Sequence, residues 1–281
     1  MAGREMCIPR IPKGRGVGFL SYRWAQGQTV TIGFIGGTTA QHQLVKQGYQ
    51  IYKDVKINLD FDYLDDYTKA DIRVSFLRGA TDGSWSEIGT SAKSVSKRQP
   101  TMNISLDTLA NVLHEIWHSL GGGHEHGSPN SRILWDKEFI ELVFASRYGW
   151  SKAQIQSQLY NRYTDQNLLV TDYDPESISH YPISSDLTLD NFSVPLNKTL
   201  SKGDKITLLR MYPPIGTMTP QETSRATTAE MEELAATIAD ENSGKIINPK
   251  PNYATPIIAT ALAGLAWYNW GSISKCTSCG K

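Results

Sequence analysis

The first clear pattern along the chain is an alternation of apolar and polar positions. Val30, Ile32 and Phe34 alternate with smaller or polar residues, and Gly36 and Gly37 follow directly. Successive side chains of a strand point to opposite faces of a sheet. The alternation therefore predicts a half-buried strand that the two glycines end.

The pattern then changes to helical spacing and back. Residues 39–54 carry apolar side chains among polar ones, which is typical of a surface helix, although Gly48 is a poor helix former. Two further strands are predicted at 56–64 and 70–77, followed by a glycine-bounded segment at 83–89. The order strand, helix, strand, strand, strand predicts a mixed sheet in an α+β fold rather than a doubly wound one.

A longer amphipathic helix is predicted after Pro100. Its apolar positions follow helical spacing, at Leu106, Leu109, Val112, Leu113, Ile116 and Leu120. We expect Ser105 or Asp107 to be its N-cap and Gly121 to end it, because these residue types favour those two positions.

Helical segments continue into the second half of the chain. One is predicted near 136–147 and another after Ser151, whereas residues 164–213 read mostly as loops. These loops close with a helix at 202–212, directly before Pro213-Pro214. Since proline cannot continue a helix, the double proline predicts a domain boundary.

The predicted organisation has three parts: an arm at residues 1–18, a main domain at 19–214 and a C-terminal extension at 215–281. The extension contains a short acidic amphipathic helix at 227–239, opened by a capping box from Thr227. We expect this helix to pack on its own domain rather than on a partner.

The end of the extension is strongly apolar. Residues 256–270 fall short of the ~20 residues that span a bilayer. We favour a docked C-terminal segment. Membrane contact, helped by acylation of Cys276 or Cys279, is the alternative.

Composition narrows the class of protein. The chain has 281 residues, and its 28 basic residues balance 28 acidic ones, which argues against a nucleic-acid partner. The hydrophobic share of 40% supports a sizeable core. All three cysteines lie outside residues 19–214, so we expect packing rather than disulfides to hold the main domain.

Histidine placement provides the chemistry. Four of the six histidines lie between positions 114 and 126. His114-Glu115-x-x-His118 falls on the predicted helix, where residues four apart share one face, so both imidazoles can reach one ion with Glu115 alongside. Gly121 allows the chain to turn back, and His124 can then approach the same ion.

These residues resemble the astacin family of metzincin zinc proteases, in its bacterial type without disulfides. The string from His114 to His124 is similar to the metzincin zinc signature, and Glu125 directly after it is typical of astacins. The segment 173–182, which contains Ser177-Ile-Ser-His-Tyr181, is similar to the astacin segment S-I-M-H-Y. Weaker likenesses lie at 70–76, 83–90, 100–103 and 200–204, so that the resemblance covers roughly residues 20–213.

The resemblance implies a zincin-like catalytic domain. Its upper half would hold a twisted, mixed five-stranded sheet and two long helices, and its lower half would be mostly irregular with a C-terminal helix. It further implies a zinc-dependent endopeptidase acting on protein or peptide substrates. The implied site residues are His114, His118 and His124 as ligands of one catalytic Zn²⁺, Glu115 as general base and Tyr181 as stabiliser of the oxyanion. The strand ending near Gly89 would pair with an extended substrate.

Two departures from the family pattern matter. Ser179 stands where the family has the methionine of its Met-turn, which either retunes the site or is a purely structural variation. The loop after the helix has three successive glycines, Gly121 to Gly123, and the bulky Trp117 precedes it; we expect Trp117 to lie in the core.

The remaining candidates have weaker assignments. His126 is a possible surplus ligand that we expect instead to contact solvent or a loop carboxylate, and His180 is expected to be structural. Glu125 is expected to pair with some basic group. His42 is interpreted as an isolated surface residue.

Three questions stay open at the level of sequence. A pseudoprotease that keeps zinc for stability and binds peptides is the alternative function, and Ser179 is the feature that favours it. The resemblance implies secretion or export, yet residues 1–20 contain no recognisable signal peptide. Cys7 in the arm is a candidate thiolate cap on the zinc.

Overall fold

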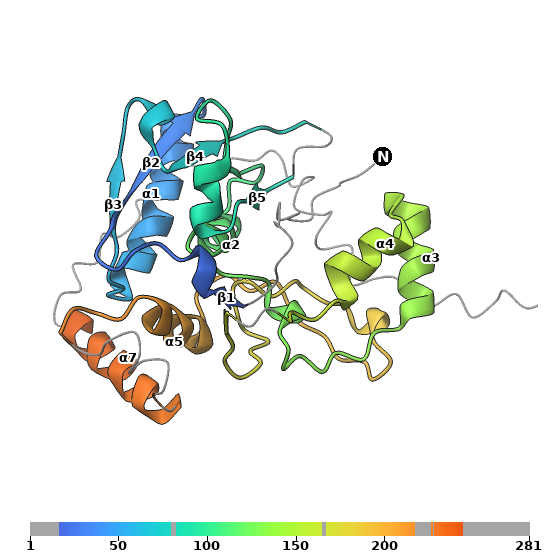
Figure 1. The fold of residues 1–281 in the computed structure, drawn as a ribbon. Coiled ribbons are helices and arrows are strands. Elements are labelled where there is room, and N and C mark those ends of the chain that lie inside the picture. The colour runs from blue at the N-terminus through green and yellow to red at the C-terminus, as the bar shows by residue number, and fades with distance from the viewer. Residues whose placement is uncertain (1–16, 80–82, 165–166, 217–225, 227, 244–281) are drawn as a thin grey trace, which may run out of the picture.

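The structure is a computed structural model that describes residues 17–79, 83–164, 167–216, 226 and 228–243 (Figure 1). The expectations for Cys7, Thr227, the tail at 256–270 and the two C-terminal cysteines fall outside these residues. Within the described part, no helix is both long and apolar enough to cross a membrane.

A five-stranded mixed sheet forms the upper half of the molecule. The strands are β2 (Thr29–Ile35), β3 (Asp60–Tyr63), β4 (Ile72–Ser75), β5 (Trp85–Ser86) and β6 (Met102–Asn103). Their order is β3-β2-β4-β6-β5, in which only β5 runs antiparallel to its neighbour. The predicted α+β fold with a mixed sheet is confirmed.

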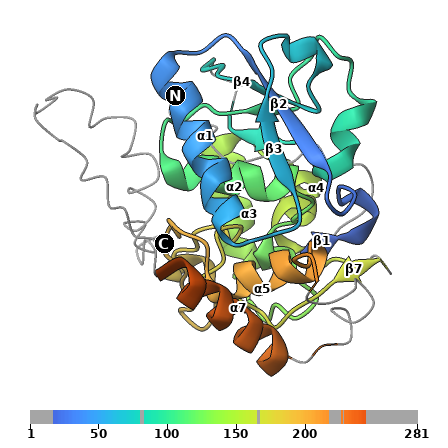
Figure 2. The same cartoon turned by 90° about the vertical axis from the view of Figure 1, so that its left-hand side faces the viewer.

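Two helices lie against this sheet (Figures 1 and 2). The first, α1 (Thr39–Asp54), begins with a capping box between Thr38 and Gln41. The second, α2 (Leu109–Ser119), packs on α1 where Gly48 leaves room. A Cβ atom at Gly48 would lie 2.7 Å from side-chain atoms of both Val112 and Ile116. The glycine that weakens α1 as an isolated helix is therefore what lets the two helices approach.

The N-cap of α2 is a correction to the sequence prediction. Thr108, rather than Ser105 or Asp107, accepts the hydrogen bond from the Asn111 N–H. The Ser105 hydroxyl is hydrogen-bonded to that of Ser84, and the Asp107 carboxylate accepts from Gln41 and pairs with Arg78. Both side chains are occupied by distant partners, so the next residue with a suitable side chain caps the helix.

The lower half is mostly irregular, with a few helices. They are α3 (Lys137–Tyr148), α4 (Lys152–Ile155), a π-helical turn (Gln156–Tyr160), α5 (Lys202–Met211) and α7 (Thr228–Ser243). A small two-stranded sheet pairs β1 (Gly18–Phe19) with β7 (Leu168–Leu169). Short 3₁₀ turns lie at Leu20–Tyr22, Tyr67–Lys69, Gly89–Ser94, Glu125–Gly127 and Ser185–Leu187.

The described part of the chain contains two hydrophobic clusters. The larger joins the sheet, α1, α2, α5 and α7, and the smaller lies around α3 and α4. Helix α7 contributes Met231 and Ile238 to the larger cluster and contacts α5 (Figure 2), so it packs on the part of the chain predicted as the main domain. The domain limits themselves stay predictions.

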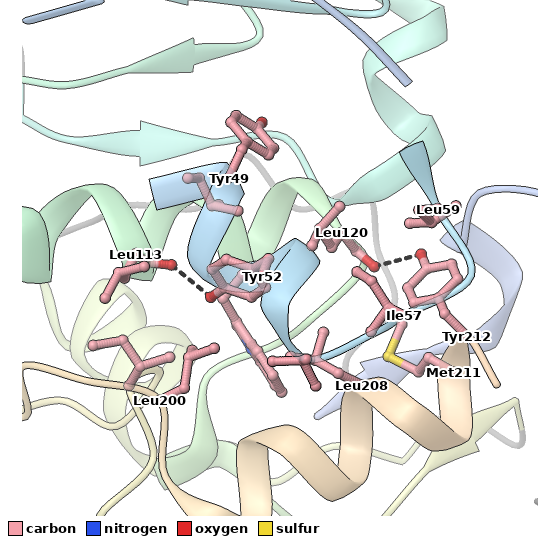
Figure 3. Packing of buried hydrophobic residues seen from close by; sticks show 14 of the residues in the cluster. Tyr49, Tyr52, Ile57, Leu59, Leu113, Leu120, Leu200, Leu208, Met211 and Tyr212 are labelled. Atoms are coloured by element: carbon pink, nitrogen blue, oxygen red, sulfur yellow. Dashed lines mark hydrogen bonds between the residues drawn. The ribbon is translucent and has the colours of Figure 1, made fainter. Parts of the chain in front are cut away.

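Helix α2 is held at two points by buried tyrosines (Figure 3). The Tyr52 hydroxyl of α1 donates to the carbonyl of Leu113 at 2.8 Å, and the Tyr212 hydroxyl beyond α5 donates to the carbonyl of Leu120 at 2.7 Å. Leu113 precedes His114 directly, and Leu120 closes the helix. The segment that carries the candidate site residues is thus fixed at both ends.

Candidate metal centre and active site

The loop after α2 turns the chain back toward the helix. Gly121 has φ of +96°, in the left-handed region that favours glycine, as the sequence predicts. Trp117 is buried in the core, as expected, and its indole N–H donates to the carbonyl of Gly123 at 2.8 Å. A Cβ atom at Gly122 would lie 2.1 Å from the Trp117 indole nitrogen. The glycines and Trp117 are therefore one feature, because the indole occupies the space of a side chain at Gly122.

This turn brings His124 to the two histidines of α2. The three Nε2 atoms lie close together: His114 is 3.2 Å from both partners, and His118 and His124 are 3.1 Å apart. Tetrahedral zinc with Zn–N bonds of ~2.1 Å separates its ligand atoms by about 3.4 Å. Among the described residues, these three form the one group of His, Cys, Asp or Glu side chains close enough to share an ion.

Two of the rings are oriented by backbone carbonyls. The Nδ1 atom of His114 lies 2.8 Å from the carbonyl of Ile178, and that of His118 lies 2.8 Å from the carbonyl of Gly122. Since a carbonyl only accepts, each Nδ1 carries the proton and each Nε2 presents its lone pair to the centre. Burial lowers the pKa of His114 to about 4 and that of His118 to about 3. Neutral imidazoles with converging lone pairs are the donor set that zinc prefers.

Glu115 and Tyr181 complete the group of predicted site residues. Glu115 follows His114 on α2 and is fully buried. The Tyr181 ring lies on the histidine cluster, with its centroid 4.3 Å from that of His124 and 6.3 Å from that of His114. The structure thus brings the tyrosine of the second motif to the histidines of the first.

Ser179, which replaces the expected methionine, belongs to a hydrogen-bonded turn. It is fully buried, and its hydroxyl lies 2.9 Å from that of Ser177. The Ser177 hydroxyl donates to the Asp204 carboxylate at 2.6 Å, so it accepts from Ser179. The side chain at this position therefore belongs to a polar network instead of making an apolar contact.

Asp204 supports this turn from the start of α5. Its carboxylate also accepts from the backbone N–H groups of Ile178 and Ser201, at 2.8 and 2.9 Å. Burial raises the pKa of Asp204 to about 6, although these hydrogen bonds act in the opposite direction. Asp204 lies in the segment 200–204, whose likeness to the astacin family implies no role for it.

Expectations for three other residues need correction. His126 contacts neither solvent nor a carboxylate: it is buried, its Nε2 lies 2.8 Å from the carbonyl of Gln158, and its ring stacks on Tyr181. Glu125 accepts from the N–H of Asp174 at 3.0 Å, and in the described residues no cation lies within ion-pair distance of it. Burial raises the pKa of Glu125 to about 8. His42 is not isolated, since it stacks on Phe34.

His180, expected to be structural, is held by two hydrogen bonds. Its Nδ1 lies 2.6 Å from the carbonyl of Tyr181, and its Nε2 lies 2.6 Å from the hydroxyl of Tyr173. The carbonyl requires a donor, so Nε2 accepts from the tyrosine. Sequence reasoning had no signal for these contacts, because they join side chains through tertiary folding.

Comparison with known proteins adds independent information. No family model matches the sequence, and no curated protein matches it. Among solved structures, the chain is similar to myroilysin, with 36% identity, a TM-score of 0.65, and coverage of 70% of this chain and 98% of that one. A second myroilysin structure gives 35% identity, a TM-score of 0.55, and coverage of 75% and 92%.

A more distant match is high choriolytic enzyme 1, a hatching enzyme zinc-protease from Oryzias latipes. It is 17% identical, with a TM-score of 0.44, and the match covers 67% of this chain and 93% of that one.

Proposed function

The chain belongs to the astacin family of zinc metalloproteases, and we propose that it is an endopeptidase that binds one catalytic zinc ion through His114, His118 and His124. The observation that carries the proposal is the convergence of three Nε2 atoms within 3.2 Å of one another. Two come from one helix face and the third from the glycine turn that follows.

Each residue of the site has a defined task in peptide hydrolysis. When bound, zinc supplies Lewis acidity toward a peptide carbonyl and toward water. Glu115 accepts the proton of the attacking water at its carboxylate and delivers it to the amine as the C–N bond breaks. Its position next to His114 on a doubly anchored helix supports this role.

Tyr181 acts on the oxygen of the same peptide bond. We assign its hydroxyl to donate a hydrogen bond to the carbonyl oxygen as negative charge develops there. The contact between its ring and His124, at 4.3 Å, supports this assignment.

The substrate is proposed to be an extended protein or peptide segment. Strand β5 is the last strand of the described sheet on one side, so its outer edge can pair with an added strand. Such pairing recognises the substrate main chain and suits cleavage of unfolded proteins.

The alternative is a zinc-binding pseudoprotease that only holds peptides. Ser179 was the feature that favoured it. The Ser177–Ser179–Asp204 network weakens that argument, since a turn built this way still presents the Ile178 carbonyl to His114. We therefore favour the enzyme.

Four further points remain proposals. The catalytic domain is assigned to residues 19–214, with 1–18 as an arm and 215–281 as an extension. Secretion or export rests on family membership, and membrane contact through the C-terminal tail is not favoured. Nucleic acid is not a proposed partner, because the formal net charge is zero.

Incubation of the full chain with a reduced, unfolded protein at neutral pH tests the function. We expect internal cleavage products in mass spectrometry, their loss with a chelator and their return with added zinc. A chain that binds one zinc ion and leaves the protein intact contradicts the proposal and supports the pseudoprotease.

A further inference from the structure

His126 is a buried histidine that the proposed mechanism does not use. It is 2% exposed, and its ring stacks on Tyr181 with centroids 4.3 Å apart and planes inclined by 22°. The His124 ring contacts Tyr181 at the same centroid distance but at 49°. Tyr181 thus contacts two candidate zinc ligands, His124 and, at 6.3 Å, His114, together with one histidine outside the ligand set.

His126 lies outside the group of described side chains that are close enough to share an ion. Its Nε2 must donate to the Gln158 carbonyl, so that nitrogen offers no lone pair. Its Nδ1 is buried and has no hydrogen-bond partner among the described residues. Burying a polar atom without a hydrogen bond costs free energy. That cost is accounted for if the ring of His126 has a task at this position.

His126 is also fixed firmly from a distant segment. Gln158, its acceptor, lies in the π-helical turn Gln156–Tyr160, a rare geometry that recurs at functional sites. The carbonyl of His126 accepts from the Arg162 guanidinium at 3.1 Å. Both the ring and the backbone of His126 are therefore tied to residues beyond α4.

We propose that His126 is a positioning residue for Tyr181: its ring, fixed by Gln158, sets where the tyrosine lies and so keeps the hydroxyl ready for the oxyanion. This inference rests on the proposed function. A stacked aromatic pair favours one orientation of the tyrosine ring. Without the His126 ring, the Tyr181 hydroxyl samples more positions. The rate of the chemical step then falls, whereas the affinity for substrate stays the same.

A double-mutant cycle between His126 and Tyr181 tests the proposal. The single changes are His126→Ala and Tyr181→Phe, and the cycle is closed by the double variant. The measurements are kcat and KM on a peptide substrate, zinc content, and affinity for a phosphinic peptide. The tetrahedral, negatively charged phosphinate group of such a peptide resembles the tetrahedral intermediate of peptide hydrolysis.

We expect His126→Ala to lower kcat by about 10-fold with KM and zinc content unchanged, and to weaken binding of the phosphinic peptide by a similar factor. In the Tyr181→Phe background the same change should lower kcat by less than about 2-fold, because there is no hydroxyl left to position. Equal losses in both backgrounds, a change in KM alone or a loss of zinc would each overturn the proposal.

Two further variants separate the ring from its hydrogen bond. His126→Phe keeps a ring for stacking, so we expect kcat within about 3-fold of the unsubstituted chain. His126→Gln keeps an N–H donor but no ring, and should be as slow as His126→Ala. A higher kcat for His126→Gln than for His126→Phe contradicts a stacking role. The comparison of these two variants decides the question even where His126→Ala does not fold.

His42 offers a matched control. It also stacks on an aromatic ring, that of Phe34 at 4.0 Å and 8°, and its Nε2 lies 2.8 Å from the carbonyl of Gly36. None of these partners belongs to the site, so His42→Ala should leave kcat unchanged. If the unsubstituted chain is inactive, the proposed function and this inference are both overturned. If the chain is active but the effects of His126→Ala and Tyr181→Phe on kcat are additive, this inference alone is overturned.

Discussion

The carboxylate of Asp204 accepts a hydrogen bond from the backbone N–H of Ile178 at 2.8 Å, across 26 residues of sequence. The carbonyl of Ile178 in turn lies 2.8 Å from Nδ1 of His114. The start of α5 is therefore connected to the histidine cluster through the backbone of one residue, Ile178. Outer partners of this kind orient a ligand ring and raise metal affinity.

Replacement of Asp204 should weaken zinc binding. In Asp204→Ala the N–H of Ile178 and the hydroxyl of Ser177 lose a buried acceptor, so we expect a loss of about 2–4 kcal/mol in the free energy of unfolding. Zinc affinity should fall by about 10–100-fold. Competition with a chromophoric chelator measures it. The exposed Asp65 provides a control, since Asp65→Ala should change neither quantity; equal affinities for the Asp204 variant and the control would remove the proposed link.

Restoring the family methionine should not improve this chain. Ser179 is fully buried and hydrogen-bonded, so Ser179→Met adds volume and removes the hydroxyl that donates to Ser177, although the backbone N–H at position 179 still donates to it. We expect a destabilisation of about 1–3 kcal/mol by chemical denaturation. Ser179→Ala removes only the hydroxyl and should cost about 1 kcal/mol. A methionine variant that is more stable and more active would mean that Ser179 is a defect rather than part of the turn.

Gly48→Ala should destabilise the protein although alanine is the better helix former. Propensity alone predicts a gain of about 1 kcal/mol. The added methyl, however, would lie 2.7 Å from side-chain atoms of Val112 and Ile116 on α2. Overpacking of this kind costs about 1–3 kcal/mol, so we expect a net loss in thermal unfolding. A raised melting temperature contradicts the close approach of α1 and α2.

How far the sequence predicts the fold depends on whether a feature is local. The strand β2, the helices α1 and α2 and the histidine string follow from spacing within a few residues, and all were predicted. The two-residue strand β6 was not predicted as a strand, since so short a segment has no period. The N-cap at Thr108 was also missed, because Ser84 and Arg78 engage the two better-placed candidates.

The surroundings of the site depend on contacts between distant segments. His126 stacks on Tyr181 across 55 positions (181 − 126), and no local pattern indicates this. The network from Asp204 to Ile178 is equally remote in sequence. The reactive groups could thus be named from the sequence, whereas the residues that hold them in place required the fold.

Acid should destabilise the chain in part through His180. Burial lowers the pKa of His180 from 6.5 to about 4. The unfolded chain therefore binds this proton first, so the stability from neutral His180 is fully present above pH 6.5 and is lost as the pH falls through about 4. The shift corresponds to up to about 3 kcal/mol.

A comparison with His180→Gln isolates this contribution. Urea unfolding of both chains is measured between pH 7 and 4 with a chelator present. The difference in unfolding free energy between the two chains then cancels the contributions of the other histidines, which both chains share. We expect the stability advantage of the unsubstituted chain to shrink with acid. An advantage that stays constant over this range excludes titration of His180 as a source.

The role of Glu115 tests the central claim most directly. The measurement is kcat/KM on an internally quenched peptide, together with zinc content, for Glu115→Ala and for Glu138→Ala, which removes an exposed carboxylate on α3. We predict that Glu115→Ala keeps one bound zinc ion and loses about 10²–10⁴-fold in kcat/KM. Glu138→Ala should keep both the zinc ion and the original kcat/KM. A Glu115→Ala chain that retains zinc and cleaves the peptide at the original rate would contradict the account.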